Sequence, residues 1–224
     1  NEWLAERQCK LALENSGHIC LSVYSSGGFR QLGNATKPVH VPGDMKGLKW
    51  RTTKSPIEFM LVKNWGATPT PYDWSQLYSG LQSGVVEGQY VASPWQHVAK
   101  LHEVAKYFTE IGGMWSGNIL AMDAKQYNAL SSQEKKWLHK AADAYGEKVN
   151  QLDNAWIKNG EDAIKASVKE WYVPSDAEMT KWRAGAIGAW VKAKGTFEPE
   201  VAKRVLLEQG MDGFVAQLEK AGAL

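Results

Sequence analysis

The sequence predicts an α/β fold with a largely parallel sheet, and three observations lead to this class. Short runs rich in β-branched and aromatic residues alternate with longer amphipathic runs, so strands and helices follow each other along the chain. Capping boxes begin helices at Ser55, Ser131 and Ser175, each with a glutamate three residues later. The run after Ser131 keeps its helical spacing of apolar residues far beyond the usual three turns, which is typical of a helix that bridges two lobes.

The first part of the chain is predicted to contain one helix and one strand. The helix spans 2–15 and ends at the sequence Asn-Ser-Gly that follows. The strand spans 18–25 and is of the buried kind, and Gly27 and Gly28 are expected to break it. A connection with two prolines occupies 29–47.

A strand over 48–53 is predicted to lead almost directly into a helix over 56–65. Ser55 is the expected N-cap of this helix, a proline takes its first position, and Glu58 completes the capping box. Gly66 is the kind of residue that follows the last turn of a helix in a left-handed conformation.

The next elements predicted are an extended segment 67–71, a helix capped by Asp73 or Ser75 and stopped by Gly84, a strand in 84–93, a helix in 94–106 and a strand over 113–123. A long helix is then predicted from Ser131, with a break at Gly160 and a continuation over 161–170. The last elements predicted are a strand over 170–173, a helix from Ser175 to Gly195, and helices over 198–209 and 212–221. One apolar side of the long helix is expected to be buried: Trp137, Leu138, Ala141, Tyr145, Val149, Leu152 and Trp156.

Arg51 has an unusual position, at the carboxyl end of a predicted strand and shortly before a helix start. In open α/β sheets ligands bind in the crevice at that edge, and the free N–H groups of a helix start favour an anion. The planar guanidinium matches a carboxylate, a sulfonate or a phosphate. Two interpretations remain at this point, an anion-binding arginine and an arginine in a solvated surface salt bridge.

The composition is that of a globular protein and excludes several classes of partner. The 224 residues suffice for one large domain or two small ones, with 44% hydrophobic and 22% charged residues. The net charge is +2 and no basic block stands out, so nucleic acid is not expected as a partner. No apolar run approaches the roughly 18 residues of a membrane span, so the chain is not expected to cross a membrane.

The two cysteines, Cys9 and Cys20, lack the spacing of metal ligands and are too few for a disulfide scaffold. A disulfide would form if the first helix packed back on the following strand. Two buried free thiols are the expected state, and two cysteines do not identify the compartment.

Sequence motifs for catalysis are missing. The chain contains no GxSxG, no P-loop, no GxGxxG opening a helix and no HExxH. The five histidines are scattered, and His97 and His102 are poorly spaced for one helix face, so neither a metal nor a cofactor is expected. No pair of carboxylates is marked out as acid and base. The missing motifs do not by themselves exclude an active site.

Eleven tryptophans are a high number, and the aromatic residues fall into two groups. Trp74, Tyr90 and Trp115 lie at junctions between predicted elements, where either a core position or a ligand contact fits the pattern. Four other tryptophans stand at helical spacing and are expected in the core: Trp137, Trp156, Trp182 and Trp190.

Three segments, "VPGDMKGLKWR", "GATPTPYDWSQLYSGLQSGVVEGQ" and "LSSQEKKWLHKAADA", make the chain resemble the solute-binding protein of a TRAP transporter (tripartite ATP-independent periplasmic, DctP-like family). In that family P-x-D-(M/L)-K-G-L-K-x-R precedes G-A-x-P-x-P, an aromatic residue and S-E-L-Y-x-A-L-Q-x-G-V-V-D-G-Q. The upstream "SGGFRQLGN" also resembles a segment of the family, and the likeness runs from about residue 20 to the C-terminus.

The resemblance implies a two-lobed periplasmic binding protein of the type II-like class, with ligand in the cleft between the lobes and a long connecting helix. An incomplete lobe I would hold 1–27 and 114–157, including that helix, and lobe II would hold 28–113 and 158–224. The chain opens within a helix, without Met or a signal sequence, so we expect further residues before Asn1.

The resemblance also implies roles for three residues of the site. Arg51 matches the arginine that holds the ligand carboxylate in a two-pronged salt bridge. Arg30 matches a second arginine that contacts ligand in some members, and Trp74 matches an aromatic residue that packs on the ligand body.

One position departs from the family. The usual D-G-Q-E-N is Glu-Gly-Gln-Tyr-Val here, so Val91 replaces an asparagine that hydrogen-bonds the carboxylate. Gln89 or Tyr90 is expected to supply the replacement contact. Trp74, Tyr90 and Trp115 together are expected to wall an apolar or cationic part of the ligand, because aromatic faces attract quaternary ammonium groups.

The function implied is that of an extracytoplasmic solute-binding protein in the periplasm, with TRAP membrane permease subunits as partners. It would capture a small organic anion for uptake driven by an ion gradient. An ectoine-like or betaine-like carboxylate is the expected ligand, and an aromatic acid or a small sulfonate is the alternative. Two other functions stay open: a ligand-sensing domain that signals to a kinase, and an enzyme on a similar lobed fold.

Overall fold

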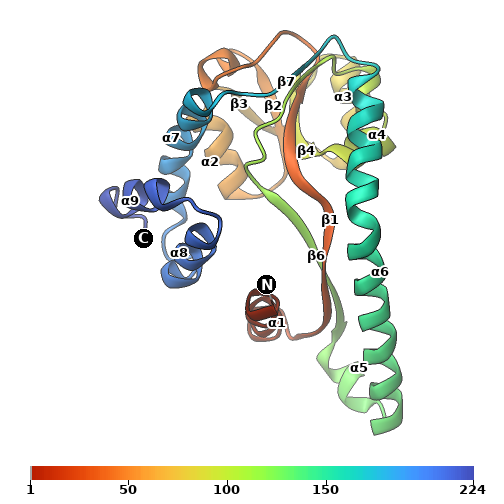
Figure 1. The fold of residues 1–224 in the computed structure, drawn as a ribbon. Coiled ribbons are helices and arrows are strands. Elements are labelled where there is room, and N and C mark those ends of the chain that lie inside the picture. Colours follow the sequence, from red (N-terminus) through yellow and green to blue (C-terminus); the bar gives the residue numbers. More distant parts are fainter. Residues whose placement is uncertain (1) are drawn as a thin grey trace.

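A computed structural model of the protein describes residues 2–224 and shows a mixed α/β fold (Figure 1). The α-helices are α1 (Glu2–Ser16), α2 (Pro56–Asn64), α3 (Leu77–Gln82), α4 (Ser93–Val98), α5 (Ala124–Ala129), α6 (Ser132–Lys165), α7 (Asp176–Ala193), α8 (Pro199–Glu208) and α9 (Asp212–Lys220). The strands are β1 (His18–Asn34), β2 (Lys49–Thr52), β3 (Thr68–Pro71), β4 (Gly88–Ala92), β5 (Tyr107–Thr109), β6 (Trp115–Asp123) and β7 (Glu170–Tyr172). Short 3-10 helices are η1 (Pro42–Met45), η2 (Trp74–Gln76) and η3 (Leu101–Glu103).

The sheet is mixed rather than largely parallel, which corrects the sequence prediction. Its strand order is β3-β2-β4-β1-β5-β7, with β6 paired to β1 outside this path. The long strand β1 runs antiparallel to β4, β5 and β6, whereas β2 is parallel to β3 and β4, and β5 is parallel to β7. The sheet is mixed because β1 is antiparallel to each of its three neighbours.

The glycines at positions 27 and 28 do not end β1, as the sequence suggested, but form an irregularity within it. The pairing with β6 shifts between Ser25 and Gly28, and both glycines have positive φ angles, +89° and +70°. A bulge of this kind bends a strand without ending it. The long helix α6 holds the bend, because the Asp153 carboxylate accepts a hydrogen bond from the Gly27 N–H at 2.9 Å.

Helix α6 also continues through Gly160, where a break was predicted. Glycine is needed there for a different reason, since a Cβ atom at this position would lie 2.8 Å from Cα of Pro94. The missing side chain lets α4 pack closely against α6. The helix begins as predicted, with a reciprocal capping box between Ser131 and Glu134.

The buried side of α6 is not the predicted apolar stripe. Trp137, Tyr145 and Leu152 are 63%, 47% and 53% exposed. The buried positions of this helix are instead mostly small residues, with one carboxylate: Ala142, Gly146, Asp153, Gly160 and Ile164. The helix therefore turns mainly small residues toward β1 and α4, where close packing of backbones requires them, and Trp137, Tyr145 and Leu152 of the predicted stripe are largely exposed.

Cys9 and Cys20 form a disulfide, and the expectation of two free thiols is wrong. After α1 the chain reverses at Gly17, whose φ is +66°, and α1 then packs back on the start of β1. This brings the two Cα atoms to 4.9 Å.

The main hydrophobic core lies in the upper body of the molecule, among β2, β4, α2 and α7 (Figure 1). Its buried members are Leu32, Val39, Met45, Leu48, Trp50, Leu61, Val62, Trp65, Ala67, Tyr90, Ile111, Trp182 and Ala189. Of the four tryptophans expected in a core, Trp182 is buried, and Trp190 packs on the C-terminal cluster of α8 and α9. Trp156 is half-buried against the ring of Trp95, and exposed Trp137 contradicts the prediction.

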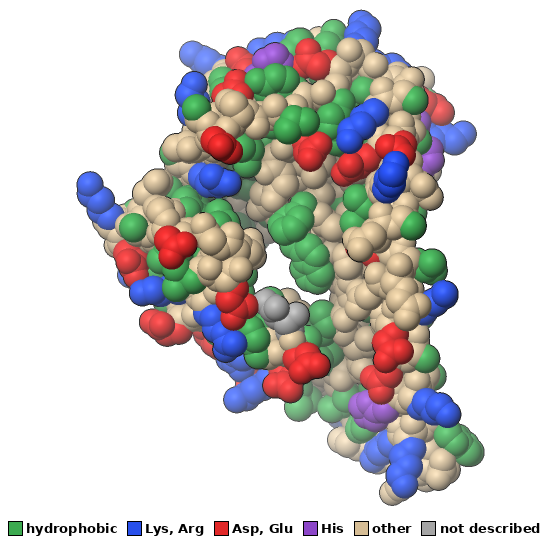
Figure 2. All heavy atoms as spheres, viewed as in Figure 1, with side chains coloured by type: hydrophobic (Ala, Val, Ile, Leu, Met, Phe, Trp, Pro, Cys, Tyr) green, Lys and Arg blue, Asp and Glu red, His purple; other side chains and the backbone are tan. Residues whose placement is uncertain are grey.

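Three elements connect the upper body with the lower part of the molecule, where α1 and α5 lie: β1, β6 and α6 (Figure 1). Figure 2 shows a hollow between the upper body, the pair α8–α9 and α1, with apolar side chains on its wall. No helix among residues 2–224 is long and apolar enough to cross a membrane.

Candidate functional site

Arg51 lies on β2 at the edge of the main core, and its side chain points into a polar junction. The residue is 6% exposed, and its Nε donates a hydrogen bond to the Tyr72 carbonyl at 3.0 Å. Among the described residues, the two terminal amino groups of the guanidinium have no hydrogen-bond partner. A buried, fixed guanidinium with two free donors is suited to a two-pronged contact with an oxyanion.

Trp74 lies beside Arg51 and covers one side of it. The segment after β3 turns into η2 at Trp74, and the Arg51 guanidinium carbon is 6.0 Å from the centroid of the indole. The indole is 41% exposed, so an aromatic surface remains accessible next to the cation. The structure therefore brings together the two residues that the sequence analysis paired, an arginine and an aromatic wall.

Glu58 is a member of the site that the sequence analysis placed only in a capping box. The Ser55 hydroxyl accepts a hydrogen bond from the Glu58 N–H, as expected of an N-cap. The Glu58 carboxylate, however, does not accept a hydrogen bond from the Ser55 N–H, so the predicted reciprocal capping box does not form. Its Oε2 accepts from the N–H of Thr53 at 3.0 Å and from the Thr53 hydroxyl. The carboxylate is 2% exposed and is thus held between β2 and α2.

Arg30 joins this cluster from β1. One terminal amino group of Arg30 is 3.7 Å from Oε1 of Glu58, and its Nε donates to the Ser116 hydroxyl at 3.3 Å. The side chain is 26% exposed. Arg30 therefore links the upper body, through Glu58, to the start of β6.

The electrostatics of Arg51 reflect these neighbours. Burial lowers the pKa of Arg51, the negative charge of Glu58 raises it, the positive charge of Arg30 lowers it, and Asp73 raises it. An arginine nevertheless stays protonated at neutral pH. The site therefore holds a permanent cation away from most of the solvent, which is the condition under which an anionic ligand binds strongly.

Tyr90 is a core residue next to the site. It is fully buried, and its ring packs against Trp65 at a centroid distance of 5.7 Å. Its hydroxyl faces Gly113, where a Cβ atom would lie 2.7 Å away. Burial raises the pKa of Tyr90, so the hydroxyl keeps its proton and is a donor at any physiological pH.

Gln89, its neighbour on β4, points to the other face of the sheet. Its amide donates to Gln96 of α4, and both side chains are fully buried. Val91, the position that departs from the family pattern, is also buried. The structure thus separates Gln89 from Tyr90 and Arg51.

Trp115 lies at the first position of β6, paired with Phe29 of β1, and is 43% exposed. It is next to Ser116, which contacts Arg30. Its indole also lines a groove of about 440 Å³ between α1 and β6 together with Leu11, Val23 and Ile119.

A comparison with protein families covers most of the chain. The family model described as "Bacterial extracellular solute-binding protein, family 7" (DctP) matches residues 3–195. The chain belongs to this family. The resemblance to TRAP solute-binding proteins that the sequence motifs indicated is therefore confirmed.

Curated relatives of this family 7 chain include two named by their ligands. The ectoine-binding periplasmic protein TeaA of Halomonas elongata is 32% identical over 150 residues, which are 67% of this chain and 43% of that protein. The 2,3-diketo-L-gulonate-binding periplasmic protein YiaO of Escherichia coli is 29% identical over 143 residues, 64% of this chain and 43% of that protein. The chain thus spans about two fifths of the length of these relatives.

Solved structures of TRAP periplasmic solute-binding proteins share the fold of this family 7 chain. A protein of Shewanella oneidensis with bound succinate superposes with a TM-score of 0.82 at 20% identity, covering 95% of this chain and 66% of that one. The ectoine-binding protein of Halomonas elongata has a TM-score of 0.76 at 26% identity, covering 96% of this chain and 68% of that one. The predicted class, a two-lobed periplasmic binding protein, is confirmed, while the boundaries of the lobes stay a prediction.

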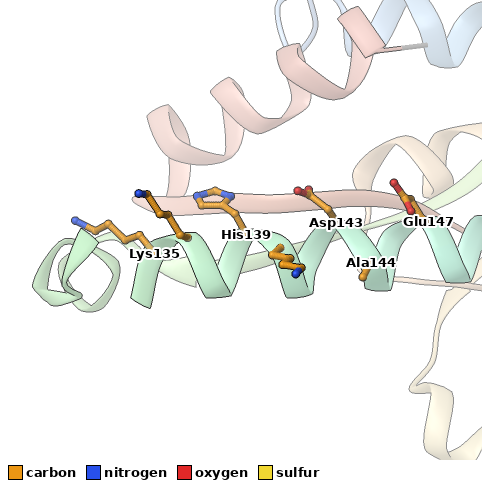
Figure 3. A pocket seen from close by; sticks show the side chains of 7 residues that line it. Lys135, His139, Asp143, Ala144 and Glu147 are labelled. Atoms are coloured by element: carbon orange, nitrogen blue, oxygen red, sulfur yellow. The ribbon is translucent and has the colours of Figure 1, made fainter. Parts of the chain in front are cut away.

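One surface hollow elsewhere on this family 7 chain lacks the chemistry of the Arg51 cluster. It has a volume of about 590 Å³ and lies along the first half of α6, far along the chain from β2. Figure 3 shows that its lining residues, among them Lys135, His139 and Glu147, all come from that one helix. Residues 2–224 contain no group of three or more His, Cys, Asp or Glu that could hold a metal ion.

Proposed function

We propose that this protein captures a small organic anion in the cleft beside Arg51 and delivers it to TRAP membrane permease subunits in the periplasm. The ligand would be a carboxylate, with zwitterionic, aromatic and sulfonate ligands included in the class. The role is binding and transport, not catalysis. Members of the family are solute-binding proteins, and the TeaA and YiaO relatives are named as periplasmic.

The observation that carries the proposal is the state of the Arg51 guanidinium. It is 6% exposed and fixed by one hydrogen bond to a backbone carbonyl, while its terminal amino groups are free among the described residues. Leaving a buried charge unpaired is costly, so this arrangement is favourable when an anion completes it. Ectoine, 2,3-diketo-L-gulonate and succinate, the ligands named with the relatives, each carry a carboxylate.

The proposal also assigns roles to the neighbours of Arg51. Trp74 would pack on the body of the ligand, since its indole is accessible beside the guanidinium. Arg30 would contact the anion from the β1 side, and Tyr90 would contribute a hydroxyl donor if the backbone at Gly113 moves on closure. Trp115 would wall the cleft near the start of β6. Gln89 faces away and would act only through packing.

A thermal-shift screen of the full chain against small carboxylates and sulfonates tests the function. A ligand that binds only the folded state raises the melting temperature. We expect a strong hit that Arg51→Ala abolishes, with a loss of about 2–5 kcal/mol in binding, as for a buried charge pair that loses one partner. The matched control is Arg183→Ala, an exposed arginine on α7. The screen is repeated after unfolding and refolding, which removes ligand carried through purification. No hit in either preparation contradicts the proposal.

A further inference from the structure

The Glu58 carboxylate is the most deeply buried charge of the Arg51 cluster, and the fold fixes its position. It is 2% exposed, and Thr53 satisfies Oε2 through both its N–H and its hydroxyl. Oε1 is buried without a hydrogen-bond partner among the described residues, and it faces Arg30 at 3.7 Å. Helix capping needs only the Ser55 hydroxyl and the Glu58 N–H, so capping does not account for this second oxygen.

The charges around the two arginines can be counted. Arg51 and Arg30 supply two positive charges, and Glu58 supplies one negative charge inside the protein. The cluster therefore has an excess of one positive charge. Asp73 is the other carboxylate that acts on Arg51, and it is exposed to solvent next to Trp74. It adds a negative field at the rim, where solvent screens it.

A ligand with one anionic group balances this excess. A second anionic group would lack a cation of its own, because Glu58 already takes up one charge of the arginine pair. It would also approach Glu58 or Asp73, and like charges at short range in a partly desolvated site repel. Binding sites commonly discriminate against a wrong ligand by leaving one of its charges unpaired or close to a charge of the same sign.

We propose that Glu58 is a specificity-determining residue that restricts this site to ligands that carry one anionic group, such as monocarboxylates, sugar monoacids or zwitterions. Glu58 acts through the two arginines and has no need to touch the ligand. The inference rests on the proposed function, that Arg51 binds an organic anion.

Matched pairs of probes test it by calorimetry on the full chain. The pairs are succinamate with succinate, galacturonate with galactarate, and 3-hydroxybutyrate with malate, each a monoanion and its dianionic counterpart, together with any hit from the screen above. We expect the monoanion of a bound pair to bind about tenfold tighter or more. In Glu58→Gln, which has nearly the same shape without the charge, this preference is expected to fall at least about fivefold or to reverse.

Two further variants keep the test sharp. Glu58→Asp retains the charge and is expected to retain the preference, even if its shorter side chain weakens binding of both probes. Glu103→Gln removes a carboxylate of η3 that accepts a hydrogen bond from Tyr78 outside the cluster, and it should leave the ratio unchanged. If Glu58→Gln does not fold, the ratio of monoanion to dianion affinity in the unaltered protein and in Glu58→Asp tests the inference.

The outcomes separate the inference from the proposed function. Binding that depends on Arg51 but favours the dianions overturns the inference alone. So does a folded Glu58→Gln with an unchanged ratio. If neither monoanions nor dianions bind, the proposed function fails and the inference fails with it.

Discussion

Arg7 of α1 and Glu198, just before α8, form a two-pronged ion pair although 191 positions separate them in the sequence. Nε of Arg7 donates to Oε2 of Glu198 at 2.9 Å, and a terminal amino group contacts Oε1. A second contact joins the same two helices, since the guanidinium of Arg204 in α8 lies 3.8 Å from the ring centroid of Trp3 in α1. Side chains thus fasten the first helix of the chain to its C-terminal helices.

The first prediction concerns the ion pair between Arg7 and Glu198. Arg7 is 24% and Glu198 44% exposed, so the pair is only partly desolvated, and we expect a coupling of about 0.5–1 kcal/mol. A double-mutant cycle of Arg7→Ala and Glu198→Ala, followed by urea unfolding, measures it. The control cycle uses Lys158 and Asp162, an exposed pair within α6 with an expected coupling of about 0.3–0.5 kcal/mol. A coupling of zero between Arg7 and Glu198 would show that the contact does not persist in solution.

The second prediction is that Arg51→Lys also loses ligand. The Arg51 side chain bonds the Tyr72 carbonyl through Nε and keeps its terminal amino groups for a ligand. A single ammonium cannot do both, so we expect affinity to fall at least about tenfold. Calorimetry with the strongest hit of the screen measures this. An affinity equal to that of the unaltered protein would remove Arg51 from the two-pronged role.

The third prediction compares two glycine substitutions. A Cβ atom at Gly160 would lie 2.8 Å from the backbone of Pro94, so Gly160→Ala should push α4 from α6 and destabilise the fold by about 1–3 kcal/mol. At Gly213 in α9 nothing lies within 4 Å of the added atom, so Gly213→Ala should be neutral or should stabilise by up to about 1 kcal/mol. Chemical denaturation of both variants decides. Equal effects would contradict the close approach of α4 and α6.

The fourth prediction is a dependence of stability on pH through Glu178. The Ser175 hydroxyl, the Ser175 N–H and the Tyr172 hydroxyl donate to this carboxylate and lower its pKa to about 2. Because the folded pKa lies below the unfolded value of about 4.3, the contribution of Glu178 is complete above that value and is lost as the pH falls toward 2. The difference in unfolding free energy between the unaltered protein and Glu178→Gln should therefore shrink over that range.

The control for this titration is Glu6→Gln, an exposed position on α1. The difference in unfolding free energy between Glu6→Gln and the unaltered protein should be small over the whole pH range. A difference in unfolding free energy between Glu178→Gln and the unaltered protein that stays constant from pH 7 down to pH 2 would contradict the role of the capping box.

The fifth prediction concerns the disulfide. It closes a segment with a sequence separation of 11 between Cys9 and Cys20 and ties α1 to β1. Loss of a link of this length costs roughly 2–3 kcal/mol on chain-entropy grounds. We expect the double variant Cys9→Ser/Cys20→Ser to unfold at lower urea concentration, and the unaltered protein treated with a reductant to match it. A reductant without effect on the unaltered protein would argue against the bond.

Most helices and strands could be predicted because their signals are local. The capping boxes at Ser131 and Ser175 start α6 and α7 as expected, and Gly66 follows α2 with a φ of +97°. Short β5 and α5 were not predicted, since neither has a periodic pattern long enough to be recognised in sequence.

The site was predictable in part. The strand-to-helix junction and the family motif both indicated Arg51, and the structure places Arg30 and Trp74 close to it. Glu58 was assigned to helix capping alone, because the choice between Ser55 and Thr53 as its partner depends on how β2 and α2 meet. Gln89 and Tyr90 are neighbours in sequence, but they lie on opposite faces of β4, as successive residues of a strand do.

The sequence by itself determined the family, the order of most of the elements and the arginine at the end of β2, because each depends on residues near one another in the chain. The tertiary structure alone decided the Cys9–Cys20 bond, the buried side of α6 and the charge balance around Arg51. These depend on how separate elements pack against one another, even where only 11 positions separate the residues, as for Cys9 and Cys20. Local propensity carries no information about such contacts, whereas packing of backbones at Gly160 and burial of Glu58 set them directly.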